Sequence, residues 1–249
     1  MGLSKKSRRG SGTVSVVILA YNEAGNLPKT VAAIHQAICD RFSAYEIIIV
    51  DDGSRDETGH IADNIAARDP RVVSLHNPKN MGCGYTFMRG AREAKCEYVW
   101  LIPGDGEIDR TAISVIAGHI GEADMVIPYV SNFRSRLLER RIVSWGYTTL
   151  VNILFFKRLH YYNGPCVFLT SQVKTLPTVK SRGFAFMAPI ILRLMKRGCS
   201  YAEVKIELKP RLYGKPSISS LKNIFSALKT LMRLFPDIYF REERRGDLN

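Results

Sequence analysis

Carboxylates stand directly after a short apolar run of the sequence, where a strand would end. The run I-I-I-V at 47–50 stops at Asp51 and Asp52, which a glycine and Ser54 follow. Such a run is typical of a strand buried on both faces of a parallel sheet, and in open α/β sheets ligands bind at the carboxyl edge. We therefore expect Asp51, Asp52 and Ser54 to contact a ligand. The alternative is that they only cap the next helix.

A second acidic pair, Asp105 and Glu107, follows the apolar run at 97–102. Glycines flank Asp105, so the two carboxylates, two positions apart, can face one cation. Hard oxygen ligands of this kind suit Mg²⁺ or Mn²⁺. The alternative is an ordinary acidic turn. We favour the metal site because we expect the edge with Asp51 and Asp52 to lie beside it.

The stretch N-P-K-N-M-G-C-G at 77–84 places Gly82 and Gly84 ahead of an expected helix at 85–94. Glycines let the backbone approach a ligand closely, and the N-terminus of a helix favours an anion. Because G-x-G turns are common, this loop indicates a binding site only together with the acidic strand ends.

The elements that must position these residues alternate between strand and helix. Strands are expected at 14–19, 46–50, 72–75 and 97–102, and helices at 27–38, around 61–66 and at 85–94. This order predicts a parallel sheet with right-handed crossovers. The fold class is therefore α/β, with a Rossmann-like, mostly parallel sheet flanked by helices. The 249 residues allow one large domain of this kind or two small ones.

The chain is strongly basic, with a formal net charge of +13, which points to nucleic acid, an anionic membrane surface or phosphate-bearing substrates. Its five cysteines form no C-x-x-C pair, so we expect neither a disulfide framework nor a zinc site, and a reducing cytoplasmic compartment fits. Residues 1–12 are predicted to be a flexible basic tail and not a secretory signal. The longest uncharged apolar stretch, 142–156, is shorter than the about 20 residues that span a bilayer, so no transmembrane helix is expected.

Two segments of the second half suit contact with a membrane. Cations at 134–141 precede the stretch 142–156, which includes Trp145 and Tyr147. This pattern predicts a helix in a membrane interface, or else a core helix with a solvated basic end. From residue 219 on, apolar residues recur at helical spacing, with lysines and arginines outside that set. Such a basic amphipathic helix binds a membrane surface or packs on the domain.

Four blocks in order resemble the inverting, nucleotide-sugar-dependent glycosyltransferases of family 2, which have the GT-A fold. They are V-V-I-L-A-Y-N-E, I-I-I-V-D-D-G-S-R-D-E-T, N-M-G-C-G and L-I-P-G-D-G-E-I, and the later E-V-K-I-E-L-K-P-R-L-Y-G-K-P-S is similar to the family's closing block. The branch resembled most is the dolichyl- or polyprenyl-phosphate sugar synthases. The resemblance implies a GT-A domain at 13–217, with a nucleotide-binding half (13–110) and an acceptor half (111–217), and an amphipathic tail at 218–249.

The resemblance also implies roles for individual residues. Displacing a nucleoside diphosphate builds negative charge on the leaving group, which a divalent ion and Arg or Lys side chains stabilise. The implied roles are nucleobase and ribose contacts for Tyr21, Glu23 and Asp52, metal ligation by Asp105 and Glu107, and contact with the diphosphate or the acceptor phosphate for Arg211 and Lys215.

Three places depart from the family pattern. Leu19 stands where the family has a proline before Y-N-E, and Pro103 replaces the first Asp of the D-x-D metal motif. The stretch Y-Y-N-G-P-C-V-F at 161–168 stands where polyprenyl-phosphate enzymes have an Asp near T-G-x-F-R. The second departure bears on metal dependence, and the third on the identity of the acceptor.

The sequence thus predicts an enzyme that moves a sugar from GDP-mannose or a UDP-sugar to a polyprenyl or dolichyl phosphate, at the cytoplasmic membrane surface. A saccharide acceptor is the alternative, but it would need a general base, and the second half offers no convincing acidic one; a phosphate is already a nucleophile. Pro103 leaves open a degenerate module that binds nucleotide without turnover. Nucleic acid is not expected as a partner, because the carboxylate-lined edge would repel its phosphates.

Overall fold

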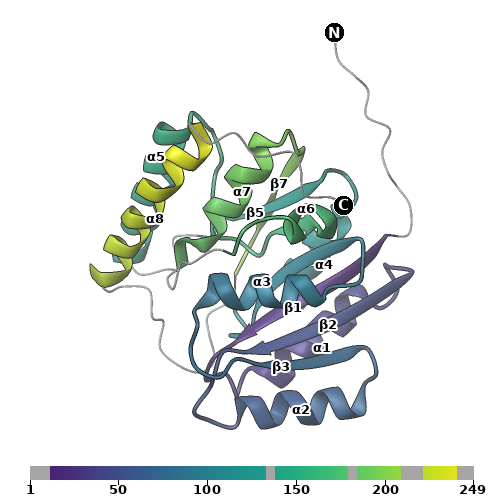
Figure 1. The fold of residues 1–249 in the computed structure, drawn as a ribbon. Coiled ribbons are helices and arrows are strands. Elements are labelled where there is room, and N and C mark those ends of the chain that lie inside the picture. Colours follow the sequence, from purple (N-terminus) through teal and green to yellow (C-terminus); the bar gives the residue numbers. More distant parts are fainter. Residues whose placement is uncertain (1–11, 133–137, 179–183, 209–220, 240–249) are drawn as a thin grey trace, which may run out of the picture.

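The computed structural model describes residues 12–132, 138–178, 184–208 and 221–239. Its strands are β1 (Thr13–Ala20), β2 (Ala44–Asp51), β3 (Val72–His76), β4 (Tyr98–Pro103), β5 (Met125–Val130), β6 (Val167–Leu169) and β7 (Tyr201–Ile206). Within the described residues they form one seven-stranded sheet in the order β3-β2-β1-β4-β6-β5-β7 (Figure 1). The short β6 runs antiparallel to β4 and β5, and the other pairs are parallel. The predicted α/β class with a mostly parallel sheet is confirmed.

The central strands are buried on both faces because both faces carry apolar side chains. Val17 of β1 lies in one buried cluster of the core, and its neighbour Ile18 lies in the other. The parallel register sets Ala20 opposite Asp51 and Leu19 opposite Pro103, so β1, β2 and β4 end at one edge of the sheet. The loops that follow these strands must therefore meet.

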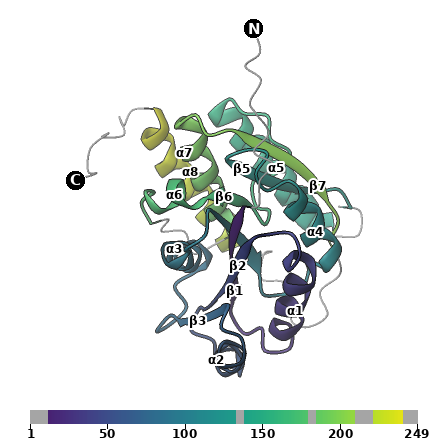
Figure 2. The same ribbon diagram turned by 90° about the vertical axis from the view of Figure 1, so that its right-hand side faces the viewer.

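Helices cover both faces of the sheet, as Figure 2 shows. On one face lie α1 (Leu27–Ile38), α2 (Thr58–Arg68) and α4 (Arg110–Gly118); on the other lie α3 (Cys83–Glu93), α6 (Thr170–Lys174), the short 3₁₀ helix η2 (Phe184–Phe186) and α7 (Met187–Lys196). The bounds of α1 agree with the predicted 27–38, and α3 begins two residues before the expected 85. Its early start brings Gly84 inside the helix and leaves Gly82 as its N-cap.

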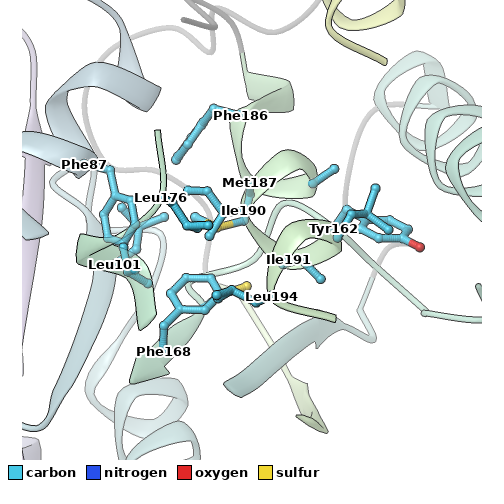
Figure 3. Close-up of a cluster of buried hydrophobic side chains, with 14 of the residues drawn as sticks. Phe87, Leu101, Tyr162, Phe168, Leu176, Phe186, Met187, Ile190, Ile191 and Leu194 are labelled. Carbon is cyan, nitrogen blue, oxygen red and sulfur yellow. The ribbon is translucent and has the colours of Figure 1, made fainter. Parts of the chain in front are cut away.

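One apolar cluster joins the two halves of the chain. Phe87 of α3 packs against Phe168 of β6 and Phe186 of η2, with ring centroids 6.2 and 6.4 Å apart. Ile190 and Leu194 of α7 fill the space beside these rings (Figure 3). The predicted nucleotide-binding and acceptor halves therefore share a core.

The apolar stretch 142–156 forms most of α5 (Leu138–Phe155), which fits both interpretations of this segment. One face of the helix, with Tyr147, Val151 and Phe155, is buried in the core. The opposite face exposes Trp145 and Ile153. Among the described residues, no helix has both the length and the apolar character needed to cross a membrane.

The C-terminal segment forms α8 (Leu221–Tyr239), which packs on the domain. Leu231 and Leu234 are buried, whereas Met232 is exposed. The Arg193 guanidinium of α7 lies 3.2 Å from the Asp237 carboxylate of α8, and the Tyr239 hydroxyl donates a hydrogen bond to a backbone carbonyl of α5. The prediction of a helix packed on the domain holds for one face of α8; membrane binding by this helix stays a prediction.

Two glycines in helices should respond in opposite ways to alanine. A Cβ on Gly90 of α3 would lie 2.5 Å from a Val17 methyl carbon of β1, whereas a Cβ on Gly146 of α5 meets no atom within 4 Å. We expect Gly90→Ala to lower the free energy of unfolding by about 1–3 kcal/mol through overpacking. Gly146→Ala should raise it by about 0.5–1 kcal/mol, because alanine favours the helix. Urea denaturation of both variants tests this, and a neutral Gly90→Ala would contradict the close packing of α3 on β1.

Candidate active site

The loops after β1 and β2 are joined by hydrogen bonds at the carboxyl edge of the sheet. The Asn22 amide donates to the Ser54 hydroxyl at 2.9 Å, and the Asn22 side-chain oxygen accepts from the Arg55 amide at 2.9 Å. The Glu23 amide donates to the Thr58 hydroxyl at 2.7 Å. Asn22 has a φ of 55°, a left-handed conformation that asparagine tolerates. Ser54, a predicted ligand contact, thus holds the neighbouring loop.

The two predicted nucleobase contacts of the first loop differ in exposure. Tyr21 is 39% exposed, so its ring is available to a ligand at the edge. Glu23 is buried, and its carboxylate accepts a hydrogen bond of 2.7 Å from the Asn26 side chain at the start of α1. Both ligand contacts stay predictions; of the two side chains, that of Tyr21 is the more exposed.

The buried carboxylate of Asp52 holds the glycine loop. Its Oδ1 accepts hydrogen bonds from the Asn77 side chain at 2.7 Å and from the Met81 amide at 2.8 Å, and its Oδ2 accepts from the Gly82 amide at 2.9 Å. Such charge-assisted bonds are stronger than neutral ones. Asp52 was expected to bind nucleobase and ribose; that role stays a prediction, and the geometry gives the side chain a structural role in the protein.

Gly53 lets the Asp52 loop approach the glycine loop. It has a φ of +70°, and a Cβ there would lie 2.6 Å from the Lys79 Cα. Only glycine fits both the backbone conformation and this close contact. The loops after β2 and β3 are therefore packed backbone against backbone.

The other carboxylate of this pair, Asp51, faces the end of β3. Its Oδ1 accepts from the Ser54 amide at 3.0 Å, and its Oδ2 lies 3.3 Å from His76 Nδ1. The other ring nitrogen of His76 lies 2.8 Å from the Asp63 carboxylate of α2. Burial lowers the pKa of His76, but the hydrogen bonds to Asp63 and Asp51 outweigh it and raise this pKa above its usual value. His76 was not among the predicted site residues, although it directly follows the predicted strand at 72–75 and ends β3 at the same edge.

The glycine loop leads into α3 with its N-terminus at the sheet edge. Gly82, with a φ of 88°, is the N-cap residue, and no side chain caps the helix. The Thr86 amide and hydroxyl both donate to the Gly82 carbonyl. Because the N-terminus of a helix carries partial positive charge, this end of α3 can receive an anion such as a diphosphate.

Asp105 and Glu107 lie in the turn after β4. The Gly104 amide donates to the Leu19 carbonyl at 2.8 Å, which holds this turn against the end of β1. The Glu107 amide donates to Asp105 Oδ1 at 3.1 Å, and both acidic residues are half-buried. Since β1 lies between β2 and β4, the acidic turn is one strand away from Asp51 and not beside it.

Charges from two loops reach the first residue of α3. The pKa of the Cys83 thiol is raised to about 11, most by desolvation and then by the negative charges of Asp52 and Asp105. Cys83 as a residue is exposed, and the two charges that act on its thiol come from the loop after β2 and the turn after β4. The turn after β4 and the loop after β2 thus both lie within electrostatic range of the α3 N-terminus.

Metal ligation by the acidic turn stays a prediction. The described residues include no group of three or more His, Cys, Asp or Glu side chains that could hold a metal ion. Mg²⁺ is commonly bound by one or two carboxylates together with substrate phosphates and water. Asp105 and Glu107 fit this second arrangement, in which the ligand completes the site. The predicted phosphate contacts Arg211 and Lys215 lie outside the described residues.

A mostly parallel sheet that is covered by helices on both faces and carries polar loops at its carboxyl edge defines the class of open α/β proteins, in which ligands bind at that edge. The chain belongs to glycosyl transferase family 2, whose model matches residues 15–174, and it is a glycosyltransferase. It is 30% identical to the polyprenol monophosphomannose synthase of Mycolicibacterium smegmatis over 86% of this chain and 83% of that protein. It is 25% identical to the undecaprenyl-phosphate mannosyltransferase of Micrococcus luteus, over 83% and 87% of the two chains.

Solved structures confirm the fold. The glucosyl-3-phosphoglycerate synthase of Mycobacterium tuberculosis, in complex with Mn²⁺, uridine diphosphate and glucosyl-3-phosphoglycerate, superposes with a TM-score of 0.69. The match covers 90% of this chain and 80% of that chain at 18% sequence identity. The GT-A architecture implied by the sequence blocks is therefore correct.

Replacing Asp52 separates a structural role from a ligand contact. Asp52→Ala removes the acceptor for three donors, and we expect it to lower the free energy of unfolding by about 2–3 kcal/mol, because buried donors lose their partner. Asp40→Ala, at an exposed aspartate after α1, is the control and should change stability little. Urea denaturation measures both. An unchanged stability of Asp52→Ala together with lost nucleotide binding would show that Asp52 contacts the ligand instead.

His76 should make stability depend on pH. Its folded pKa lies above the usual 6.5, so its contribution is fully present below about pH 6.5 and is lost as pH rises through the folded pKa. The Tm advantage of the natural chain over His76→Gln should therefore be larger at pH 6 than at pH 8. An advantage that grows with pH would contradict the pairing of a protonated His76 with Asp51 and Asp63.

Proposed function

We propose that this glycosyltransferase moves a sugar from a nucleotide-sugar donor to a polyprenyl or dolichyl phosphate at the cytoplasmic surface of a membrane. The observation that carries the proposal is the convergence of the loops after β1, β2, β3 and β4 on the N-terminus of α3. The names of the Mycolicibacterium and Micrococcus relatives support the lipid-phosphate acceptor and a mannosyl donor. The +13 net charge supports contact with an anionic membrane.

The donor would lie across this edge. Gly82 and the first turn of α3 would receive the diphosphate, since backbone amides and the helix dipole favour an anion there. Tyr21, exposed at the end of β1, would lie against the nucleobase. Asp105 and Glu107 would hold Mg²⁺ or Mn²⁺, which when bound neutralises the charge that develops on the leaving diphosphate.

Transfer to a phosphate acceptor requires little from the protein beyond holding the donor and the acceptor in the right positions. A phosphate monoester oxygen is ionised at neutral pH and can attack the anomeric carbon directly, while the bond to the nucleoside diphosphate breaks on the opposite face. The product is a glycosyl phosphate of inverted configuration, and no proton has to be removed from the nucleophile. Arg211 and Lys215 are proposed to balance the phosphate charges on both sides of this transfer.

A second candidate is a module that binds nucleotide without turnover. It is favoured by one observation: Pro103, and not an aspartate, occupies the last position of β4, where the first carboxylate of the D-x-D motif is expected. Metal affinity would then depend on Asp105 and Glu107 alone, and turnover decides between the two candidates.

Thermal shift with nucleotides tests the donor site. We expect GDP, UDP or one of their sugars to raise the Tm in the presence of Mn²⁺, because a ligand that binds only the folded state stabilises it. Asp105→Asn should lose the metal-dependent part of this shift, and the control Asp40→Asn should keep it. Sugar transfer to a short-chain polyprenyl phosphate is then measured with the donor that binds. Absence of any nucleotide shift would overturn the proposal, and a shift without transfer would favour the non-catalytic module.

A further inference from the structure

The outer face of α5 exposes several large apolar side chains, and soluble proteins rarely expose such groups together. Ile142, Trp145 and Ile153 are 60%, 72% and 66% exposed, and Phe156, directly after the helix, is 86% exposed. The spacing of three and eight residues puts Ile142, Trp145 and Ile153 along one stripe of the helix, and Phe156 follows at its C-terminal end. We call these four residues the α5 face. Exposed apolar groups gathered in this way mark an interaction site.

The core of the protein does not account for the α5 face. The opposite face of the helix already packs inward through Tyr147, Val151 and Phe155. α8 lies beside α5 and contacts it through Phe155, with ring centroids 6.1 Å from both Phe235 and Tyr239. The outer face is therefore left over after the packing partners of α5 within the described chain are in place.

The backbone of Phe156 is in an unfavourable conformation, and burial of its side chain does not compensate for it. Its φ is +50°, and the Lys157 amide donates to the Asn152 carbonyl at 3.0 Å. This is the glycine position of a Schellman motif, in which a side chain is strained. Because the ring is exposed, no burial within the protein offsets the strain. Such strain is commonly found where a side chain serves a function.

The charges around the α5 face select the partner. Residues 141–159 contain Arg141, Lys157 and Arg158 and no acidic residue. A two-fold contact with a second copy would bring these cations against themselves, whereas an anionic lipid surface attracts them. Tryptophan and phenylalanine beside lysine and arginine are also the side chains of helices that lie in a membrane interface.

We propose that the α5 face docks the enzyme on an anionic lipid bilayer, with Trp145, Ile153 and Phe156 inserted at the headgroup level. This inference rests on the proposed function in that the lipid acceptor lies in the same bilayer. It adds which surface of the molecule faces the lipid, and it assigns the attachment to α5.

The chain contains its own probe for this docking. It has two tryptophans; Trp100 is fully buried and donates to the Pro165 carbonyl at 2.9 Å, whereas Trp145 lies on the α5 face. Vesicles of phosphatidylglycerol and phosphatidylcholine should shift the fluorescence of the full chain to shorter wavelength, and brominated lipid should quench it. Phosphatidylcholine alone should give a weaker change. Trp145→Phe should abolish the spectral change, because only Trp100 remains.

Variants of the α5 face supply the quantitative test. Ile153→Ser with Phe156→Gly should lower vesicle partitioning at least about tenfold, since two apolar side chains no longer transfer from water. Val115→Ser, at an exposed apolar residue of α4, is the matched control and should bind like the natural chain. Phe156→Gly alone should weaken partitioning without lowering the Tm, because glycine removes the strain.

The outcomes separate this inference from the proposed function. If the full chain and Ile153→Ser/Phe156→Gly partition equally, or if sedimentation shows a dimer that this variant abolishes, the docking surface is overturned. Donor thermal shift and transfer to a short-chain acceptor in detergent, measured on the same variants, should be unchanged. Loss of vesicle binding with retained transfer supports the inference. Vesicle binding through the α5 face without any donor shift would leave the docking surface standing and overturn the proposed function.

Discussion

The candidate active site depends on one buried carboxylate, that of Asp52. At the end of β2 it accepts hydrogen bonds from two backbone amides and one side chain of the loop that leads into α3. This anchors the N-terminus of α3 at the sheet edge, while Gly90 further along the helix allows close contact with Val17 of β1. α3 is therefore fixed at two points, so the end that would receive the diphosphate has a defined position before any ligand arrives.

This arrangement divides the polar residues of the edge into two groups. The carboxylates of Glu23, Asp51 and Asp52 are turned toward other parts of the protein and build the loops. Tyr21 and the acidic turn after β4 are more exposed. A sheet buried on both faces concentrates its polar groups at the ends of its strands, and there the same residue types must serve both the fold and the ligand. The three buried carboxylates would therefore contribute to binding by holding the loops in place before a ligand arrives.

The sequence was sufficient for the four parallel strands β1 to β4, because long apolar runs and helical spacing determined β1, β2 and the bounds of α1, but it did not identify the parallel pair of β5 and β7. It could not show the antiparallel β6, since three residues carry no periodicity. It placed Asp51, Asp52 and Gly82 at the edge of the sheet, where the structure has them, but it could not give their partners: the contact of Asp52 with the Gly82 amide depends on the packing of two loops distant in sequence. His76 was missed because a lone histidine after a short strand gives no signal without its neighbours.

With the chemistry proposed for this site, the surface that attaches the enzyme to the membrane would affect the rate of transfer as much as the site that binds the donor. An ionised phosphate needs no general base, so the rate depends on how often the acceptor meets the bound donor in the right orientation. A lipid phosphate is confined to the plane of a bilayer, and an enzyme attached to that plane raises its effective concentration without any additional contact. Within the described chain, α5 combines a buried face that stabilises the core with an exposed apolar face. The same helix would thus stabilise the acceptor half through its buried face and hold the enzyme at the lipid surface through its exposed face.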